Sequence, residues 1–119
     1  MDEFIHHKDL KKTFEDNFVI VKLVVQEQGD KKHLENPGGV AVLERLGGKD
    51  AGLPFSAFLD ANGKTVVNSN REGKAGQNIG HPYAPEEIGW FMVMLERAAP
   101  RLSKADAAKI RTFLQSQKK

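Results

Sequence analysis

The chain has 119 residues, of which 39% are hydrophobic and 29% are charged, a composition typical of one soluble globular domain rather than of a disordered or fibrous protein. Its formal net charge is +2, from 18 basic and 16 acidic residues spread along the sequence, so no nucleic-acid partner is indicated. There are no cysteines, which excludes disulfides, thiolate nucleophiles, zinc–thiolate sites and iron–sulfur ligation for this chain.

The first part of the chain predicts a helix and then a strand. Residues 2–16 carry an amphipathic stripe at spacings of three, three and four, formed by Phe4, His7, Leu10 and Phe14. Residues 18–25 then have the length and β-branched content of a strand that is covered on both faces, as in a parallel sheet. Lys22 interrupts this run, which is far shorter than the roughly 20 residues of a membrane helix, so no membrane segment is expected.

A short apolar helix is predicted next, over residues 40–46. It follows Asn36-Pro37-Gly38 and stops at Gly47-Gly48. Strand, helix and strand in that order favour a right-handed crossover, so residues 19–25 and 55–59 are expected to be parallel members of one sheet.

The stretch from residue 52 to residue 67 predicts a β-hairpin, around which the other elements would pack. Residues 55–59 form an apolar run that predicts a buried strand, residues 60–63 form a turn cluster, and residues 65–67 are β-branched. Asp60 is interpreted as a turn residue that bonds its own backbone. Pro54 stands at the entrance of the first strand, where no ladder hydrogen bond has to be donated.

The last part of the chain predicts a long connection and two helices. Residues 68–83 contain several glycines and few apolar side chains, so we expect an exposed connection that is either mobile or functional. Pro85-Glu86-Glu87 opens a helix whose buried face is formed by Ile88, Phe91, Met92 and Leu95. Trp90 and Met94 form a second apolar face, which fits packing by the last helix or by another subunit. Ser103 with Asp106 is expected to cap that last helix.

The order of these elements resembles the thioredoxin fold. The similarity is to bacterial thioredoxin-like domains whose sequences run close to "FVIVKL", "GLPFSAFLDANGK", "NIGHP" and "PEEIGWF", and it covers residues 4–99. The resemblance implies an α/β class, with a mixed sheet flanked by helices and an extra C-terminal helix. Residues 1–119 would then be a single domain, with residues 1–100 as its core and residues 101–119 as the additional helix.

The resemblance also implies a site. In that family Pro54 would be a cis-proline facing the active site, and Leu53 would present its backbone to an extended peptide, so the candidate peptide-binding groove is Gly52, Leu53 and Pro54. Family members carry a strand and then C-x-x-C at the start of the first helix. Here the sequence starts inside what would be that helix, so both would lie upstream of Met1. The chain as it stands is expected to be redox-inactive, with no catalytic residue and no cofactor.

Three functions remain open from the sequence. In the first, the chain is a redox-inactive relative that binds peptide by main-chain pairing. In the second, it is a fragment of an active disulfide reductase or isomerase. In the third, it is a structural module that forms a homodimer because its sheet lacks a central strand. The absence of an N-cap before the first helix favours truncation. No signal peptide is visible at this N-terminus, and the sequence does not assign a cellular compartment. A periplasmic or secreted location would require a signal segment upstream of Met1.

Other catalytic or metal sites are not supported. His6 and His7 are adjacent and point about 100 degrees apart on a helix, so they cannot share one metal ion, and no metal site is expected. Ser56, Ser69 and Ser103 lack the setting of a catalytic nucleophile.

Overall fold

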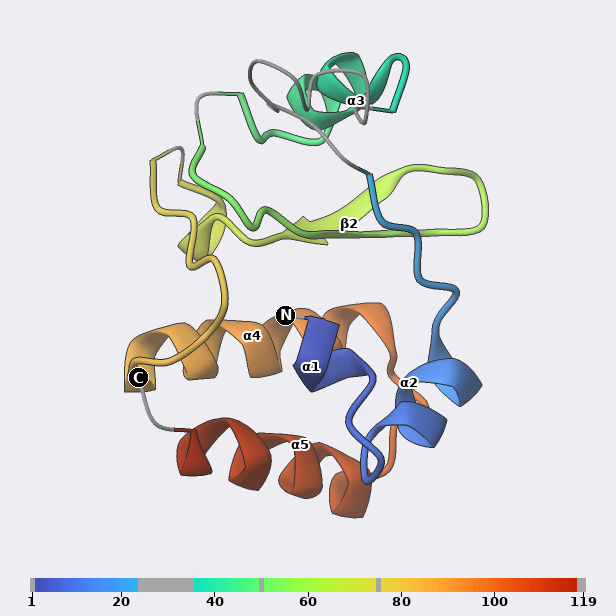
Figure 1. Ribbon diagram of the computed structural model, residues 1–119, viewed down its shortest axis with the longest axis vertical. Helices are drawn as coiled ribbons and strands as arrows, with labels where there is room; N and C mark the ends of the chain where they lie inside the picture. The colour runs from blue at the N-terminus through green and yellow to red at the C-terminus, as the bar shows by residue number, and fades with distance from the viewer. Residues whose placement is uncertain (1, 24–35, 50, 75, 118–119) are drawn as a thin grey trace.

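The computed structural model describes residues 2–23, 36–49, 51–74 and 76–117 (Figure 1). Its elements in chain order are α1 (Asp2–Ile5), α2 (Lys11–Asn17), α3 (Gly39–Arg45), β1 (Ala57–Leu59), β2 (Thr65–Asn68), the 3-10 turn η2 (Arg71–Gly73), α4 (Pro85–Ala98) and α5 (Lys104–Ser116). Helices thus combine with a small sheet, which confirms the mixed α/β class expected from the sequence.

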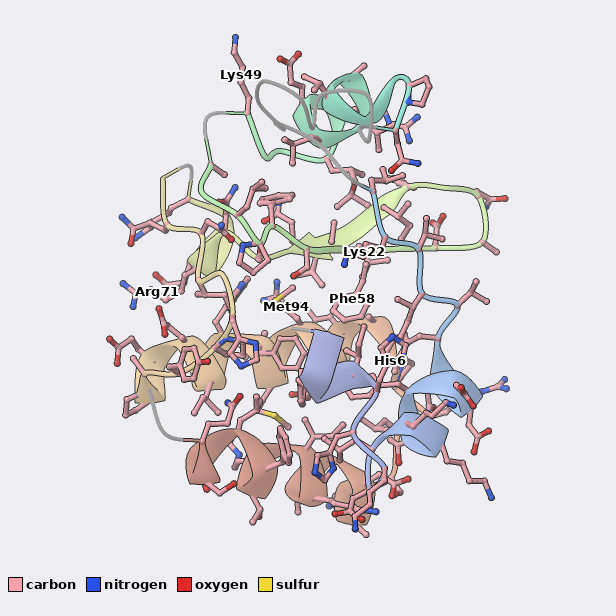
Figure 2. All side chains as sticks on the ribbon, in the orientation of Figure 1. His6, Lys22, Lys49, Phe58, Arg71 and Met94 are labelled. Atoms are coloured by element: carbon pink, nitrogen blue, oxygen red, sulfur yellow. The ribbon has the colours of Figure 1, made fainter. Side chains whose placement is uncertain are left out.

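The elements are arranged in layers. Figure 1 shows the hairpin of β1 and β2 above α4, with α5 on the other side of α4 and α3 beyond the hairpin. Apart from the pairing of β1 with β2, the most extensive contacts between elements join α4 to α5 and α4 to β2. Phe58 extends from the hairpin toward α4 (Figure 2) and packs against the main apolar core. Helix α4 therefore lies between the hairpin and α5 and packs against both.

The apolar core is concentrated between the helices. Met94 of α4 and Ile110 of α5 have no exposed surface. The buried cluster consists of Phe4, Leu10, Phe14, Val67, Ile79, Ile88, Trp90, Phe91, Met94, Leu95, Ile110 and Leu114. Ile88, Phe91 and Leu95 are buried as predicted, and Met92 is half-buried against the same cluster. Trp90 and Met94 are also buried. The indole nitrogen of Trp90 donates to the carbonyl of Asn68, so this side chain faces β2 and not the last helix.

The predicted helix over residues 2–16 is divided into α1 and α2. Between them the backbone N–H of Asp9 donates to Nδ1 of His7, a local bond that competes with continuous helical pairing. The amphipathic stripe is nevertheless confirmed at its three apolar positions, because Phe4, Leu10 and Phe14 are buried. The fourth position, His7, is half-buried, with its ring 4.6 Å from the ring of Phe113.

The predicted strand over residues 18–25 is wrong for residues 18–23, and residues 24 and 25 lie outside the described residues. No strand is assigned there, and Val19 is 94% exposed. Within the described part of the chain the sheet has two antiparallel strands, so the predicted parallel pairing with residues 55–59 is absent. An apolar, β-branched run favours extended backbone, but a strand also needs a partner that accepts its ladder bonds, and the described residues contain no strand paired with this segment.

The hairpin is confirmed. Strand β1 pairs antiparallel with β2, with Phe58 opposite Val67. Oδ1 of Asp60 accepts hydrogen bonds from the backbone N–H groups of Asn62 and Lys64, both at 2.9 Å, so Asp60 organises the turn as predicted. The first strand is only half-buried, however, because the hairpin is covered by α4 on one face and its end extends into solvent.

The helix termini follow the local signals in the sequence. Helix α3 ends before Gly47, whose φ of 97° lies in the left-handed region, and the N–H of Gly48 donates to the carbonyl of Leu43. Oγ of Ser103 accepts from the N–H of Asp106 at 3.0 Å, which confirms the predicted cap of α5.

Candidate functional site

Two of the three predicted groove residues, Gly52 and Leu53, line a cleft beside the segment that enters β1. This Leu53 cleft has a volume of about 230 Å³ and is lined by Ala51, Gly52, Leu53, Gly76, Asn78, Ile79 and Gly80. The peptide bond between Leu53 and Pro54 is cis, in agreement with the expectation from the resemblance. Pro54 lies against the opposite wall, where a Cβ on Gly80 would be 3.7 Å from the proline ring. In the structure, residues 52–54 therefore lie against residues 76–80 of the connection that follows η2.

One amide side chain holds the two walls together. Nδ2 of Asn78 donates to the carbonyl of Gly52 at 2.6 Å and to that of Pro54 at 3.0 Å. Oδ1 of Asn78 accepts from Oγ of Ser69 at 2.6 Å and from the N–H of Gly80 at 3.2 Å. Asn78 thus fixes the backbone on both sides of Leu53, a role that no local signal in the sequence indicates.

The side chain of Ser69 holds that of Asn78 in place through a hydrogen bond. Ser69 has no exposed surface, and its Oγ accepts from the N–H of Ser56 at 2.9 Å while donating to Asn78. Its backbone donates to the carbonyl of Ser56 and accepts from the N–H of Ile79. Every polar group of Ser69 is therefore satisfied, as buried polar groups require. Its role is to connect the hairpin with the connection, in agreement with the rejection of Ser69 as a nucleophile.

The backbone of Leu53 is left unpaired. Within the described residues, neither its N–H nor its C=O makes a hydrogen bond, although the carbonyls on both sides of it are bound by Asn78. The Leu53 side chain is 50% exposed beside the cleft. One residue thus offers a main-chain donor, a main-chain acceptor and an apolar side chain, which is what pairing with an extended peptide requires.

The predicted exposed connection, residues 68–83, is confirmed only in part. Residues 72–74, 76 and 77 are exposed, but four of the described residues of the connection are buried, namely Ser69, Asn70, Ile79 and Pro82. Asn68 and Asn70 extend the polar network toward α3, since their side-chain amides donate to the carbonyls of Leu46 and Gly47, each at 3.0 Å. The connection does contain few apolar residues, as the sequence shows. Its polar side chains are nevertheless buried, because they donate hydrogen bonds to backbone carbonyls.

The Leu53 cleft is lined by backbone groups and by apolar and amide side chains. The described residues that line it include no charged side chain and no hydroxyl or thiol. Ser103 is engaged in capping α5, and His6 and His7 lie near α1, on the helical side of the molecule. In the part of the chain that the structure describes, no three His, Cys, Asp or Glu side chains are grouped to hold a metal ion.

No protein-family model, curated protein or solved structure matches this chain. None of the helices in the described ranges is long and apolar enough to cross a membrane. The functional interpretation therefore depends on the geometry of the cleft and on the residues that hold it.

Proposed function

We propose that this chain is a thioredoxin-like domain, related to thiol–disulfide oxidoreductases, that lacks redox cysteines and binds extended peptides at the Leu53 cleft. The order of elements supports the proposal, with a helical N-terminal part, a hairpin that is entered through Gly52-Leu53-Pro54, and a closing helix. The absence of cysteine from the sequence removes the redox chemistry and leaves peptide binding as the activity of this site.

The single observation that carries the proposal is the unpaired main chain of Leu53. Its neighbours are fixed by Asn78 before any ligand arrives, so binding does not have to order this backbone. A peptide strand would form two main-chain hydrogen bonds, each contributing about 1 kcal/mol, and would cover the exposed leucine side chain. Such a contact is weak and tolerant of sequence, because main-chain groups are common to all peptides.

The proposal is tested by NMR titration with a blocked pentapeptide of alternating valine and threonine. We expect saturable shifts of the Leu53 and Ile79 amides, which lie at the cleft. The matched control is the same peptide with its central amide methylated, which removes the donor but keeps the side chains. Equal binding of the two peptides would exclude main-chain pairing. Insulin reduction should show no turnover, and measurable turnover would refute redox inactivity.

A second candidate function, a homodimerising module, is favoured by the exposed apolar segment after α2. Val19 is 94% exposed and Val21 is 75% exposed, and neither belongs to a strand of the sheet in the described part of the chain. A second copy could cover these side chains by strand pairing. Light scattering after size exclusion tests this, with Val21→Lys as the disruptive variant and Val40→Lys, on exposed α3 surface, as the control. A monomer at high concentration would exclude the dimer.

A further inference from the structure

A second cleft lies between β2 and α4, which occupy adjacent layers of the molecule (Figure 1). This β2–α4 cleft has a volume of about 560 Å³ and is lined by β2, by the turn η2 and by Trp90, Val93 and Arg97 of α4. The two clefts share no lining residue among those that the structure describes. The volume of the β2–α4 cleft is in the range of pockets that hold small organic molecules, so it is a candidate site separate from the Leu53 cleft.

Two β-branched side chains give the cleft its exposed apolar surface. Val66 of β2 is 42% exposed, and Val93 of α4 is half-buried. The amide of Asn68, which also lines the cleft, is already engaged within the chain. Its nitrogen donates to the carbonyl of Leu46, and its oxygen accepts from the N–H of Asn70, each at 3.0 Å. A ligand in the cleft would therefore meet hydrocarbon at the valines and no free group at this amide.

The cleft also contains a cation without an acidic partner. The guanidinium carbon of Arg97 lies 5.3 Å from the centroid of the Trp90 ring, a cation–π contact that holds the charge at the cleft. Among the described residues no carboxylate forms an ion pair with Arg97. Glu72, the acid in the lining, pairs with Lys74 at 3.5 Å, which offsets its negative charge. Arg97 is therefore the charge in the cleft that a ligand can neutralise.

We propose that the β2–α4 cleft binds a small apolar carboxylate, of the arylalkanoic acid class. The carboxylate pairs with Arg97, because a guanidinium presents parallel N–H donors that match the two oxygens of a carboxylate. The hydrocarbon part of the ligand lies against Val66 and Val93 and removes their exposed surface from water. A neutral ligand of the same shape keeps the apolar contact and loses the ion pair, so a comparison of the two measures the part played by Arg97.

The experiment uses the fluorescence of Trp90, the one tryptophan in the sequence, which lines this cleft and not the Leu53 cleft. The probe is phenylpropionate, and the reference is phenylpropanamide, which has the same hydrocarbon part without the charge. We expect a saturable fluorescence change with the acid and binding of the amide that is about fivefold weaker. NMR shifts of backbone amides should locate the acid at Val66 and Val93 rather than at Leu53.

Three variants separate the ion pair from the apolar contact. Arg97→Gln should abolish the preference for the acid. Arg101→Gln, which removes an exposed charge outside the cleft, should leave that preference unchanged. Val66→Thr keeps a β-branched side chain but replaces a methyl group by a hydroxyl, so it should weaken the binding of both probes by about twofold and keep their ratio.

Each of four results would overturn the proposal. The absence of a saturable change with phenylpropionate would exclude the site, and equal affinity for the acid and the amide would exclude recognition of the carboxylate. A preference for the acid that persists in Arg97→Gln would exclude Arg97 as the group that pairs with it. NMR shifts confined to the Leu53 amide would place the ligand in the other cleft.

Discussion

The helices α1, α2, α4 and α5 are joined by apolar side chains, whereas the walls of the Leu53 cleft are joined by amide and hydroxyl side chains. In the helical layer Met94 and Ile110 are fully buried among other hydrocarbon groups. At the cleft, Ser69 and Asn78 bond to particular backbone atoms. Apolar burial is non-directional and sets how stable the chain is, while hydrogen bonds are directional and set where the backbone of Leu53 lies. Stability and peptide binding should therefore respond to different substitutions.

The largest expected effect is on the helical layer. Leu114 of α5 is almost completely buried, so Leu114→Ala should lower the free energy of unfolding by about 3 kcal/mol, through lost burial and the cavity left behind. Urea denaturation measures the change. Gln115→Ala, at the exposed neighbouring position, should change stability by less than about 0.5 kcal/mol. Binding by the folded protein at Leu53 should be retained, and its loss in Leu114→Ala would contradict the separation of the two regions.

The next effect is on the cleft network. Asn78→Ala removes the donor to Gly52 and Pro54 and leaves the buried hydroxyl of Ser69 without its acceptor, at a cost of about 2 kcal/mol in unfolding free energy. Peptide binding at Leu53 should fall by about tenfold or more, because the backbone on both sides of Leu53 is released.

A matched variant separates the two roles of this amide. Asn78→Asp keeps an acceptor for Ser69 but places a carboxylate against the two carbonyls, so it should impair binding while its Ser69 contact persists. The measurements are urea denaturation and the NMR titration with the valine–threonine peptide. Full affinity in Asn78→Ala would show that the network does not position Leu53.

The features that could be predicted from the sequence are those with local causes. The turn at Asp60 and the cap at Ser103 depend on side chains within four residues of the backbone N–H groups that they bind, and the helix end at Gly47 depends on the left-handed backbone that glycine adopts. The buried stripe of α4 follows in the same way from its own periodicity. Gly52, Leu53 and Pro54 were located through the resemblance to a family, and in the structure Gly52 and Leu53 line one cleft.

The remaining features depend on contacts between distant segments. Residues 18–23 have the composition of a strand, but strand formation requires a neighbouring strand, which the segment's own sequence does not specify. Asn78 is one asparagine among several in a glycine-rich connection. Its role arises because the fold brings the carbonyls of Gly52 and Pro54 within reach of its amide. No local pattern distinguishes it from a solvent-exposed loop residue.

A smaller effect is expected where α3 meets the segment that enters β1. Gly48 is buried between α3 and the segment that enters β1, and a Cβ there would lie 2.9 Å from the ring of Phe55, closer than real Cβ atoms approach. Gly48→Ala should therefore destabilise the chain by about 1.5 kcal/mol through overpacking. Gly52→Ala is the matched control, because a Cβ at Gly52 would meet no atom within 4 Å. Thermal unfolding of the two variants should differ, and equal melting temperatures would contradict close packing at Gly48.

The smallest effect should have the opposite sign. Gly89 lies inside α4, and a Cβ there would meet no neighbouring atom within 4 Å, so alanine can replace it without a clash. Gly89→Ala should stabilise the chain by about 0.8 kcal/mol, because glycine has more backbone freedom to lose when the helix forms. Urea denaturation should show a higher midpoint with an unchanged slope, and the peptide titration should give the same affinity at Leu53. A decrease in stability would mean that the added methyl group clashes with neighbouring atoms at this face of α4. A change in affinity would mean that the helical layer affects the position of Leu53 in the cleft.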